Sequence, residues 1–174
     1  MNSEQMKAYV LLARNGDTEA FCKLYELYYQ DMYRYAYYVL GNEEDAQDAI
    51  SDTDLDSFSG IKNLNKADSF KSWIFKILST KCKRQQAVYV SNRENLKTDP
   101  NTSELTKEDY PYADSIDVNA AFATLNEMER SVVSLMVFAG YNSREAAKIL
   151  GSPEGTIRSL KSRALSKMSQ YLTI

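Results

Sequence analysis

Residues 142–168, NSREAAKILGSPEGTIRSLKSRALSKM, have the pattern of two short helices joined by a tight turn. Ser143 can cap the first helix with its hydroxyl, and Gly151 stands where a helix usually ends, because glycine adopts the left-handed conformation without strain. Ser152 can cap a second helix, with Pro153 at its first position, where no N–H is needed. Spacings of three and four then give that helix an apolar face, formed by Ile157, Leu160, Ala164 and Met168.

The rest of this second helix is polar and cationic. From residue 151 onward one acid, Glu154, stands against four cations: Arg158, Lys161, Arg163 and Lys167. A helix, a glycine turn and a second helix with a cationic face are typical of a helix-turn-helix DNA reader. An ordinary helical hairpin with solvated cations has the same pattern, so this segment alone leaves both interpretations open.

The composition of the 174 residues, with 44% hydrophobic and 26% charged, is that of a globular protein with one or two domains. No apolar run reaches the roughly 18 residues of a membrane span, and the N-terminus does not resemble a signal peptide. Two isolated cysteines, Cys22 and Cys82, fit a reducing compartment. We therefore expect a cytoplasmic protein with no membrane insertion.

The chain has no histidine, which removes histidine-based triads and histidine zinc sites. It also has no glycine-rich phosphate loop. These absences predict that the chain is not an enzyme, and we expect neither a cofactor nor a metal site.

The net charge of −3 is unevenly distributed. Residues 1–90 carry 11 cations and 13 acids, residues 91–115 carry three and six, and residues 116–174 carry seven and five. A DNA footprint is local, so a basic surface can lie on an acidic chain.

The first half predicts helices over residues 3–14, 17–40 and 43–58 from apolar spacings and turn residues. Eight of the 13 tyrosines fall between Tyr9 and Tyr38, which favours half-buried packing over base stacking. The third helix carries seven acids and no cation, so a cationic partner would relieve their repulsion. Asp54 is unexpected, because it lies between Ile50 and Phe58 on the apparent apolar face.

A fourth helix, beginning near Ser69, is cationic and contains no acid as far as Asn92. Trp73 and Phe75 lie within its basic run, as aromatic residues do in single-strand binders, although core packing is the slightly preferred interpretation for Trp73. The neighbouring segments of opposite charge predict two surfaces with different partners.

The composition changes between residues 91 and 115, which are polar, acidic and contain two of the three prolines. This segment predicts a flexible linker between two helical domains, residues 1–90 and 116–174. The expected fold is all-α, with the C-terminal domain a helix-turn-helix domain and no single core spanning both halves. Asn126 and Glu129 form a capping-box pattern at the start of a helix in the second domain.

Three stretches together resemble the extracytoplasmic-function sigma factors of bacterial RNA polymerase. Residues 15–53, NGDTEAFCKLYELYYQDMYRYAYYVLGNEEDAQDAISDT, resemble the start of the family's second conserved region, and residues 68–78, DSFKSWIFKIL, resemble its end. Residues 125–168, LNEMERSVVSLMVFAGYNSREAAKILGSPEGTIRSLKSRALSKM, resemble its fourth region. The resemblance implies a factor that binds core RNA polymerase and directs transcription initiation at promoter DNA, and it allows an anti-sigma factor as a further partner.

The resemblance also implies residue roles. The acidic helix would dock on core polymerase through Asp45, Asp48, Ala49 and Asp52. The basic helix and the loop before it would bind and open the −10 element through Lys71, Trp73, Lys76, Thr80, Lys81, Lys83 and Arg84. The last helix would read the −35 element through Glu154, Thr156, Arg158, Ser159, Ser162 and Arg163. The sequence departs from the family pattern at Asp54, Phe58 and Thr80, where an aromatic residue, tryptophan and asparagine are usual.

Two other classes of function fit part of the pattern. A helix-turn-helix repressor with an N-terminal sensing domain predicts tight DNA binding by a free, dimeric protein. A protein-interaction module or small helical enzyme predicts no promoter-dependent activity.

Overall fold

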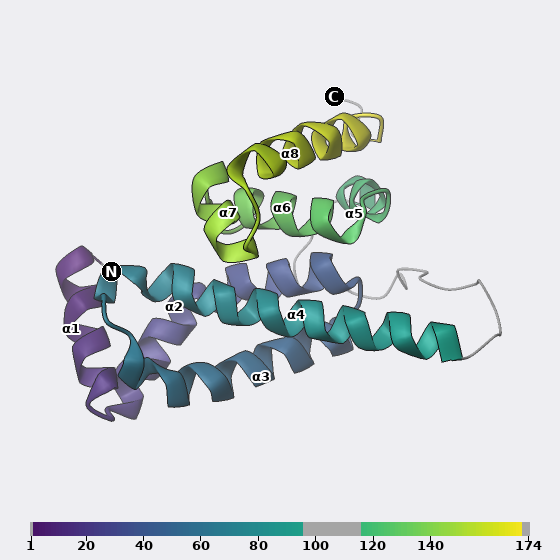
Figure 1. Cartoon of the computed structure of the whole chain (residues 1–174). Coiled ribbons are helices and arrows are strands. Elements are labelled where there is room, and N and C mark those ends of the chain that lie inside the picture. The colour runs from purple at the N-terminus through teal and green to yellow at the C-terminus, as the bar shows by residue number, and fades with distance from the viewer. Residues whose placement is uncertain (1, 96–115, 172–174) are drawn as a thin grey trace.

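The computed structural model describes residues 2–95 and 116–171, which form helices and, within those ranges, no strand (Figure 1). The first half contains α1 (Ser3–Arg14), α2 (Thr18–Leu40), α3 (Glu43–Gly60), the 3-10 turns η1 (Ile61–Asn63) and η2 (Ala67–Ser69), and α4 (Phe70–Asn95). The second contains α5 (Ile116–Ala123), α6 (Glu127–Val137), α7 (Ser143–Leu150) and α8 (Glu154–Met168). The expected all-α fold with a helix-turn-helix is confirmed. Residues 2–95 are called the N-terminal half below, and residues 116–171 the C-terminal half.

Most helix ends follow the predicted turn chemistry. The side chains of Asp17, Asn42 and Asn126 accept hydrogen bonds from the first turns of α2, α3 and α6. Gly41 and Gly151 end α2 and α7 in the left-handed conformation, with φ of 85° and 65°. The capping box of Asn126 with Glu129 is present as predicted.

The caps within the helix-turn-helix differ from the prediction. Asn142, and not Ser143, caps α7, because its side chain pairs with Glu145 in a reciprocal capping box. Pro153 occupies the cap position of α8, so that helix begins one residue later, at Glu154.

Two helices are longer than predicted. The helix α3 continues through Ser57 to Gly60, where a break was expected. The helix α4 continues to Asn95, which places five residues of the predicted linker inside a helix. The rest of that predicted linker, residues 96–115, lies outside the described residues.

The N-terminal half is built on α2, α3 and α4, with α1 packed across their ends (Figure 1). Its core contains large, fully buried side chains from α2 and α4: Leu24, Met32, Tyr35, Phe70, Ile74, Phe75 and Leu78. Phe75 is therefore a core residue and cannot stack on a base. Tyr33, Tyr35 and Tyr38 are also buried, so for these three tyrosines the packing interpretation is confirmed.

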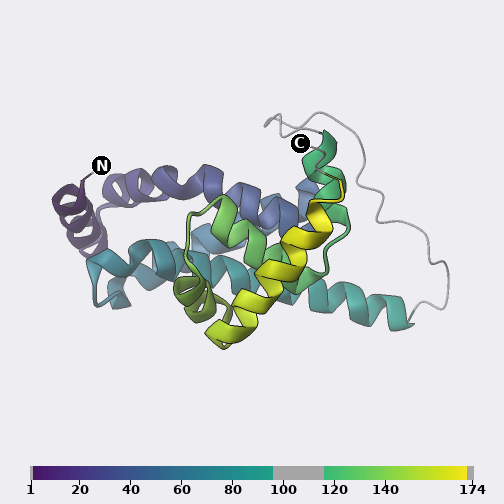
Figure 2. The ribbon, with the colours of Figure 1, turned by 90° about the horizontal axis from the view of Figure 1, so that it is seen from above.

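The C-terminal half lies across α2 and α4 (Figures 1 and 2). One buried cluster runs from α2 and α4 of the first half into α6, α7 and α8 of the second. A second cluster places Tyr38 of α2 against Phe122 and Phe138, with ring centroids 4.3 and 4.9 Å apart. The expectation that no core would span the two halves is therefore wrong, because their apolar side chains meet at long range. The division into domains at residues 90 and 116 stays a prediction.

Candidate nucleic-acid interface and acidic face

The outer side of α8 carries the polar side chains that the sequence placed there. Its inner side is buried through Ile157, Leu160, Ala164 and Met168, as predicted from their spacing. The opposite side, called the reading face below, is exposed and consists of Thr156, Arg158, Ser159, Ser162 and Arg163. In Figure 1 α8 lies on the side of the C-terminal half away from α2 and α4.

Glu154 organises the start of the reading face. It is only partly exposed, and its carboxylate pairs with Arg158 one turn along α8 and with Arg144 of α7 at 3.6 Å. One carboxylate therefore orients two guanidinium groups, and a direct role of Glu154 in reading DNA stays a prediction. Further along, Nε of Arg163 donates to the carbonyl of Ser159 at 3.4 Å.

An ion pair between a buried glutamate and a partly exposed lysine anchors the far end of α8. Nζ of Lys167 donates to both carboxylate oxygens of Glu129, at 2.9 and 2.7 Å, and Glu129 is 2% exposed. Burial opposes the charge of Glu129, but hydrogen bonds from Lys167 and from the backbone of Asn126 outweigh it and lower the pKa of the carboxyl. This pair ties α8 to α6 and so fixes the direction of the reading face.

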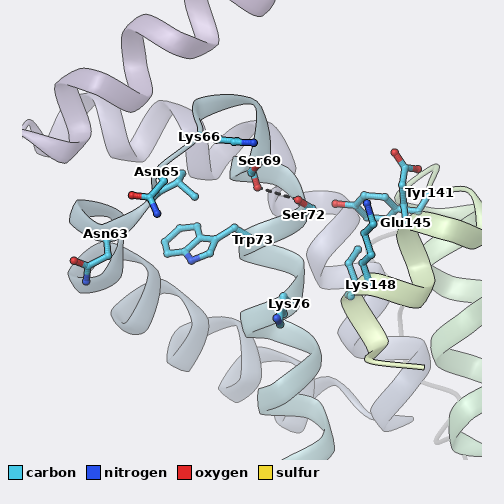
Figure 3. A pocket seen from close by; sticks show the side chains of 12 residues that line it. Asn63, Asn65, Lys66, Ser69, Ser72, Trp73, Lys76, Tyr141, Glu145 and Lys148 are labelled. Carbon is cyan, nitrogen blue, oxygen red and sulfur yellow. Dashed lines mark hydrogen bonds between the residues drawn. The ribbon is translucent and has the colours of Figure 1, made fainter. Parts of the chain in front are cut away.

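A pocket of about 640 Å³ opens between the two halves (Figure 3). The N-terminal half lines the pocket with two amides, two lysines, two hydroxyl groups and the indole of the tryptophan: Asn63, Asn65, Lys66, Lys76, Ser69, Ser72 and Trp73. The C-terminal half closes the other side with Tyr141, Glu145 and Lys148. Within the described part of the chain, the lysines of this interdomain pocket form no ion pair. The pocket thus combines an aromatic surface, amide groups and unpaired cations, which suit a nucleotide.

Trp73 is half-buried rather than a full core residue. Its ring packs on Phe70, 5.8 Å between centroids, and approaches Gly60 so closely that a Cβ there would lie 3.2 Å from the indole. One side of the ring therefore rests on the protein while the other lines the pocket.

The loop before α4 supplies pocket residues that the sequence did not single out. Ile61 and Leu64 are buried and hold the loop, while Asn63, Asn65 and Lys66 are exposed between and after them. The alternation of buried and polar residues over positions 61–66 is the signal that could have identified them.

The predicted contact residues of α4 differ in how available they are. Lys76, Thr80 and Arg84 are exposed. Lys81 is 15% exposed at its side chain and pairs with Asp56 at 2.5 Å and, more weakly, with Asp52 at 4.0 Å. Two of the seven acids of α3 therefore have a cation of α4 beside them, and Lys81 bridges α3 and α4 rather than standing free.

Lys71 and Lys83 form hydrogen bonds with the C-terminal half. Nζ of Lys71 donates to the carbonyl of Ala139, and Nζ of Lys83 donates to the carbonyl of Leu150 at 3.0 Å. These two lysines thus serve as contacts between the halves in this structure.

The four residues predicted on the acidic face of α3 do not share one surface. Asp48 and Asp52 are exposed, but Asp45 is 9% exposed and accepts a hydrogen bond from the side chain of Asn42. Ala49 is fully buried and therefore cannot touch a partner directly in this structure. Asp45 is held by the capping residue of its own helix, Asn42, so the available acidic face is narrower than the spacing indicated.

Asp54 does not lie on the buried face of α3. That face consists of Ala46, Ala49, Ile50, Thr53 and Ser57. Asp54 and Phe58 are exposed and line an open groove of about 400 Å³ with Phe21 and Tyr25 of α2. Partial burial raises the pKa of Asp54, but the carboxylate reaches water, which removes the apparent anomaly.

The described residues contain no group of three or more histidine, cysteine or acidic side chains arranged for a metal ion. None of the helices in the same ranges has the length and apolar character needed to cross a bilayer.

Comparison with known proteins assigns the two halves to two conserved regions of the sigma-70 family. Residues 24–87 match the family model for sigma-70 region 2, and residues 121–170 match that for sigma-70 region 4. The chain is 28% identical to the ECF RNA polymerase sigma factor SigM of Mycobacterium tuberculosis, over 98% of this chain and 84% of that protein. It is also 28% identical to the ECF RNA polymerase sigma factor BldN of Streptomyces coelicolor, over 98% of this chain and 67% of that protein.

A solved structure supports the same fold. The sigma factor RpoE of Bartonella quintana, determined in complex with the anti-sigma factor NepR, aligns with a TM-score of 0.71 at 21% identity. The alignment covers 90% of this chain and 99% of that one. Since the two family models match in order over more than half of the residues, the chain belongs to the extracytoplasmic-function sigma factors of the sigma-70 family, which act with RNA polymerase in promoter-directed transcription initiation and are not classical enzymes.

Proposed function

We propose that this sigma factor reads the −35 element with the reading face of α8. The observation that carries the proposal is the separation of α8 into a fully packed inner side and an exposed outer side with two arginines. A helix of a helix-turn-helix enters the major groove, where arginine donates two hydrogen bonds to guanine. Arg158 and Arg163 are therefore the proposed base contacts, with Thr156, Ser159 and Ser162 around them.

We propose that the −10 element is opened over α4 and the loop before it. Extruded bases need an aromatic surface and polar groups, and their backbone needs cations. The aromatic surface and the polar groups for the bases come from Trp73, Asn63 and Asn65. The cations for the backbone come from Lys66, Lys76 and Arg84. Thr80 is exposed on the same helix, one turn beyond Lys76, and its hydroxyl donates a hydrogen bond to the carbonyl of Lys76.

We propose that core polymerase binds the acidic helix α3 through Asp48 and Asp52. Both side chains are exposed, and the acids of this helix make contact with DNA unfavourable. A protein surface rich in cations fits this charge. An anti-sigma factor is a further proposed partner, since the RpoE structure contains one, and the proposed role places the protein in the cytoplasm.

Reconstituted transcription with core RNA polymerase tests the −35 assignment. Templates selected for activity with the wild-type factor are compared with versions whose −35 element is scrambled. Arg158→Ala or Arg163→Ala should each reduce transcription by about 5-fold to 150-fold, since a good base contact is worth about 1–3 kcal/mol. A base contact should also change the preferred −35 sequence, whereas a phosphate contact should weaken all templates alike. If both variants match the wild type on both templates, the reading face is assigned wrongly.

Polymerase pull-down tests the acidic face. Asp48→Lys is the clean variant, because Asp52 lies beside Lys81 and its reversal would also disturb α4. Glu4→Lys, an equal charge change at an exposed position of α1, is the matched control. We expect Asp48→Lys to lower polymerase capture and Glu4→Lys to leave it unchanged; equal capture by both variants and the wild type would contradict the assignment.

A further inference from the structure

The hydroxyl group of Tyr141 is buried without a hydrogen-bond partner. Tyr141 is 7% exposed, and within the described part of the chain no atom pairs with its hydroxyl oxygen. The ring itself is fixed by an edge-on contact with Phe75, 5.4 Å between centroids, and by the ammonium of Lys71, 4.8 Å from its centre. A buried hydroxyl without a partner is unfavourable, and native structures contain few of them. This hydroxyl therefore needs a partner that the described residues do not supply.

The same hydroxyl is directed into the interdomain pocket. Tyr141 lines this pocket of about 640 Å³, and Figure 3 shows its hydroxyl pointing toward Ser72 on the N-terminal wall. The hydroxyl of Ser72 donates elsewhere, to the carbonyl of Ser69 at 3.0 Å. Burial raises the pKa of Tyr141, so its hydroxyl keeps the proton at neutral pH. Tyr141 can therefore donate a hydrogen bond to a molecule in the pocket.

Lysines from both halves surround the same space. Lys66 and Lys76 come from the N-terminal half and Lys148 from α7, and none of the three forms an ion pair with a described residue. One acid, Glu145, also lines the pocket, and its carboxylate accepts a hydrogen bond from the backbone of Asn142 at 2.9 Å. Three lysines against one glutamate leave the lining with a net charge of +2. The pocket therefore favours an anionic ligand.

An aromatic surface and two amides complete the lining. One side of the Trp73 indole rests on Phe70, and the other side faces the pocket. The exposed side chains of Asn63 and Asn65 lie on the same side of the pocket as the indole (Figure 3). A planar base can stack on the indole, and an amide has both the donor and the acceptor that the edge of a base needs.

We propose that the interdomain pocket binds a free nucleoside diphosphate. Its base stacks on Trp73, its phosphates are held by Lys66, Lys76 and Lys148, and Tyr141 donates a hydrogen bond to it. The volume of about 640 Å³ falls within the range of about 300–1,000 Å³ that is usual for small-molecule sites. The inference goes beyond the proposed function, because its ligand is a small molecule and none of its evidence depends on promoter reading.

The ligand contacts residues of both halves. Tyr141 and Lys148 belong to the C-terminal half, whereas Trp73, Lys66 and Lys76 belong to the N-terminal half. A molecule that binds the folded protein and not the unfolded chain stabilises the fold by mass action. Binding should therefore raise the midpoint of thermal unfolding, in addition to changing the fluorescence of Trp73.

Titration of the full-length protein with GDP and with ADP tests the proposal. Because Trp73 is the only tryptophan, quenching of its fluorescence reports on the pocket, and calorimetry gives the affinity. Pyrophosphate and guanosine are titrated in parallel, since each carries only one part of the ligand. We expect saturable quenching and a higher unfolding midpoint with at least one of the two nucleotides, and weaker binding of either fragment.

Two variants separate contacts with the ligand from contacts within the fold. Tyr141→Phe keeps the packed ring and removes a hydroxyl that has no partner in the described chain, so without ligand it should unfold no earlier than the wild type. Its affinity for the nucleotide should fall by about threefold to tenfold. Lys148→Met removes a cation from the pocket and should weaken binding by about tenfold or more. Lys161→Met, an equal charge change on α8 outside the pocket, is the matched control and should bind as the wild type does.

Absence of saturable binding for both nucleotides would overturn the proposal, as would wild-type affinity in both Tyr141→Phe and Lys148→Met. Should Tyr141→Phe fail to fold, Lys148→Met alone decides the result. Quenching of Trp73 by a strand of thymidine nucleotides, with no binding of either free nucleotide, would assign the pocket to DNA alone and also overturn it. None of these readouts depends on transcription: if promoter-selective transcription fails while the nucleotide binds as expected, the proposed function is wrong and the nucleotide site stands, and the reverse pattern removes only the nucleotide site.

Discussion

The helices α4 and α8 both bear a row of cations, but they differ in what those cations touch. On α8 the reading face is exposed, and its arginines contact groups of the helix-turn-helix itself, Glu154 and the carbonyl of Ser159. On α4, Lys81 bridges to the acidic helix, and Lys71 and Lys83 donate to the C-terminal half. One helix therefore presents its charges to solvent, whereas the other uses most of them inside the protein.

This difference shows that a count of cations along a helix does not give the charge available to DNA. Five cations of α4 were predicted to face nucleic acid, but Lys76 and Arg84 alone among them are exposed without a protein partner in the described residues. On the proposed −10 surface, Lys71 and Lys83 are therefore engaged by the C-terminal half, while the arginines of the proposed −35 surface are exposed.

The largest effect is expected from the aromatic contact between α2 and the C-terminal half. Tyr38→Ala removes a buried ring that packs against both Phe122 and Phe138, and a large-to-small change of this kind costs about 3–5 kcal/mol. Denaturant unfolding should show this loss, together with greater exposure of Trp73. Tyr171→Ala, at a half-exposed ring beyond α8, is the control and should change stability by less than about 0.5 kcal/mol. A neutral Tyr38→Ala would mean that the halves do not pack as described.

A smaller effect is expected where α8 is anchored. Glu129→Gln removes the charge opposite Lys167 but keeps an oxygen for the backbone of Asn126, and should cost about 1–3 kcal/mol at neutral pH. Because the folded pKa of Glu129 is lowered, its stabilisation is present above the unfolded pKa and is lost as the pH falls through the folded value. Unfolding curves measured from pH 7 down to pH 3 should therefore converge for the two proteins below the ordinary glutamate pKa of 4.5. Curves that stay parallel would show that the ion pair does not form.

The smallest effect sharpens the comparison within α4. Each phosphate contact on a single strand contributes about 0.7 to the slope of log affinity against log salt concentration. Arg84→Met should lower that slope by about this amount, whereas Lys81→Met should hardly change it, because Lys81 is held by Asp56. The slopes are measured for a single strand of thymidine nucleotides bound to each full-length variant. Equal changes for both variants would mean that Lys81 is as available as Arg84.

The sequence predicted α8 well, because its two sides follow from a local spacing rule that needs no knowledge of the rest of the fold. It also predicted the caps at Asp17, Asn42 and Asn126, which depend on neighbours within four residues. The site on α4 could be predicted only in part. The roles of Lys71 and Lys83 depend on carbonyls more than 60 residues away, which no spacing rule reaches.

The acidic helix shows the same limit on a smaller scale. The spacing predicted that Asp45, Asp48 and Asp52 share one exposed face. In the structure the side chain of Asn42 donates a hydrogen bond to Asp45, and Lys81 of α4 lies beside Asp52. Ala49 was assigned through family resemblance, and its burial follows from the close packing of α3 on α2 and α4. Local rules gave the helices and their apolar sides, whereas contacts between helices decide which charges remain available.

The central claim is that contacts between the halves, and not the number of cations, decide which charges of α4 are available. Incorporation of 5-fluorotryptophan gives one fluorine signal, since Trp73 is the chain's only tryptophan and lines the pocket between the halves. The account predicts that Tyr141→Ala, which removes a ring packed on Phe75 of α4, moves this signal, whereas Arg84→Met, at an exposed cation, leaves it at its wild-type position. An unchanged signal in Tyr141→Ala, or equal shifts in the two variants, would contradict the claim.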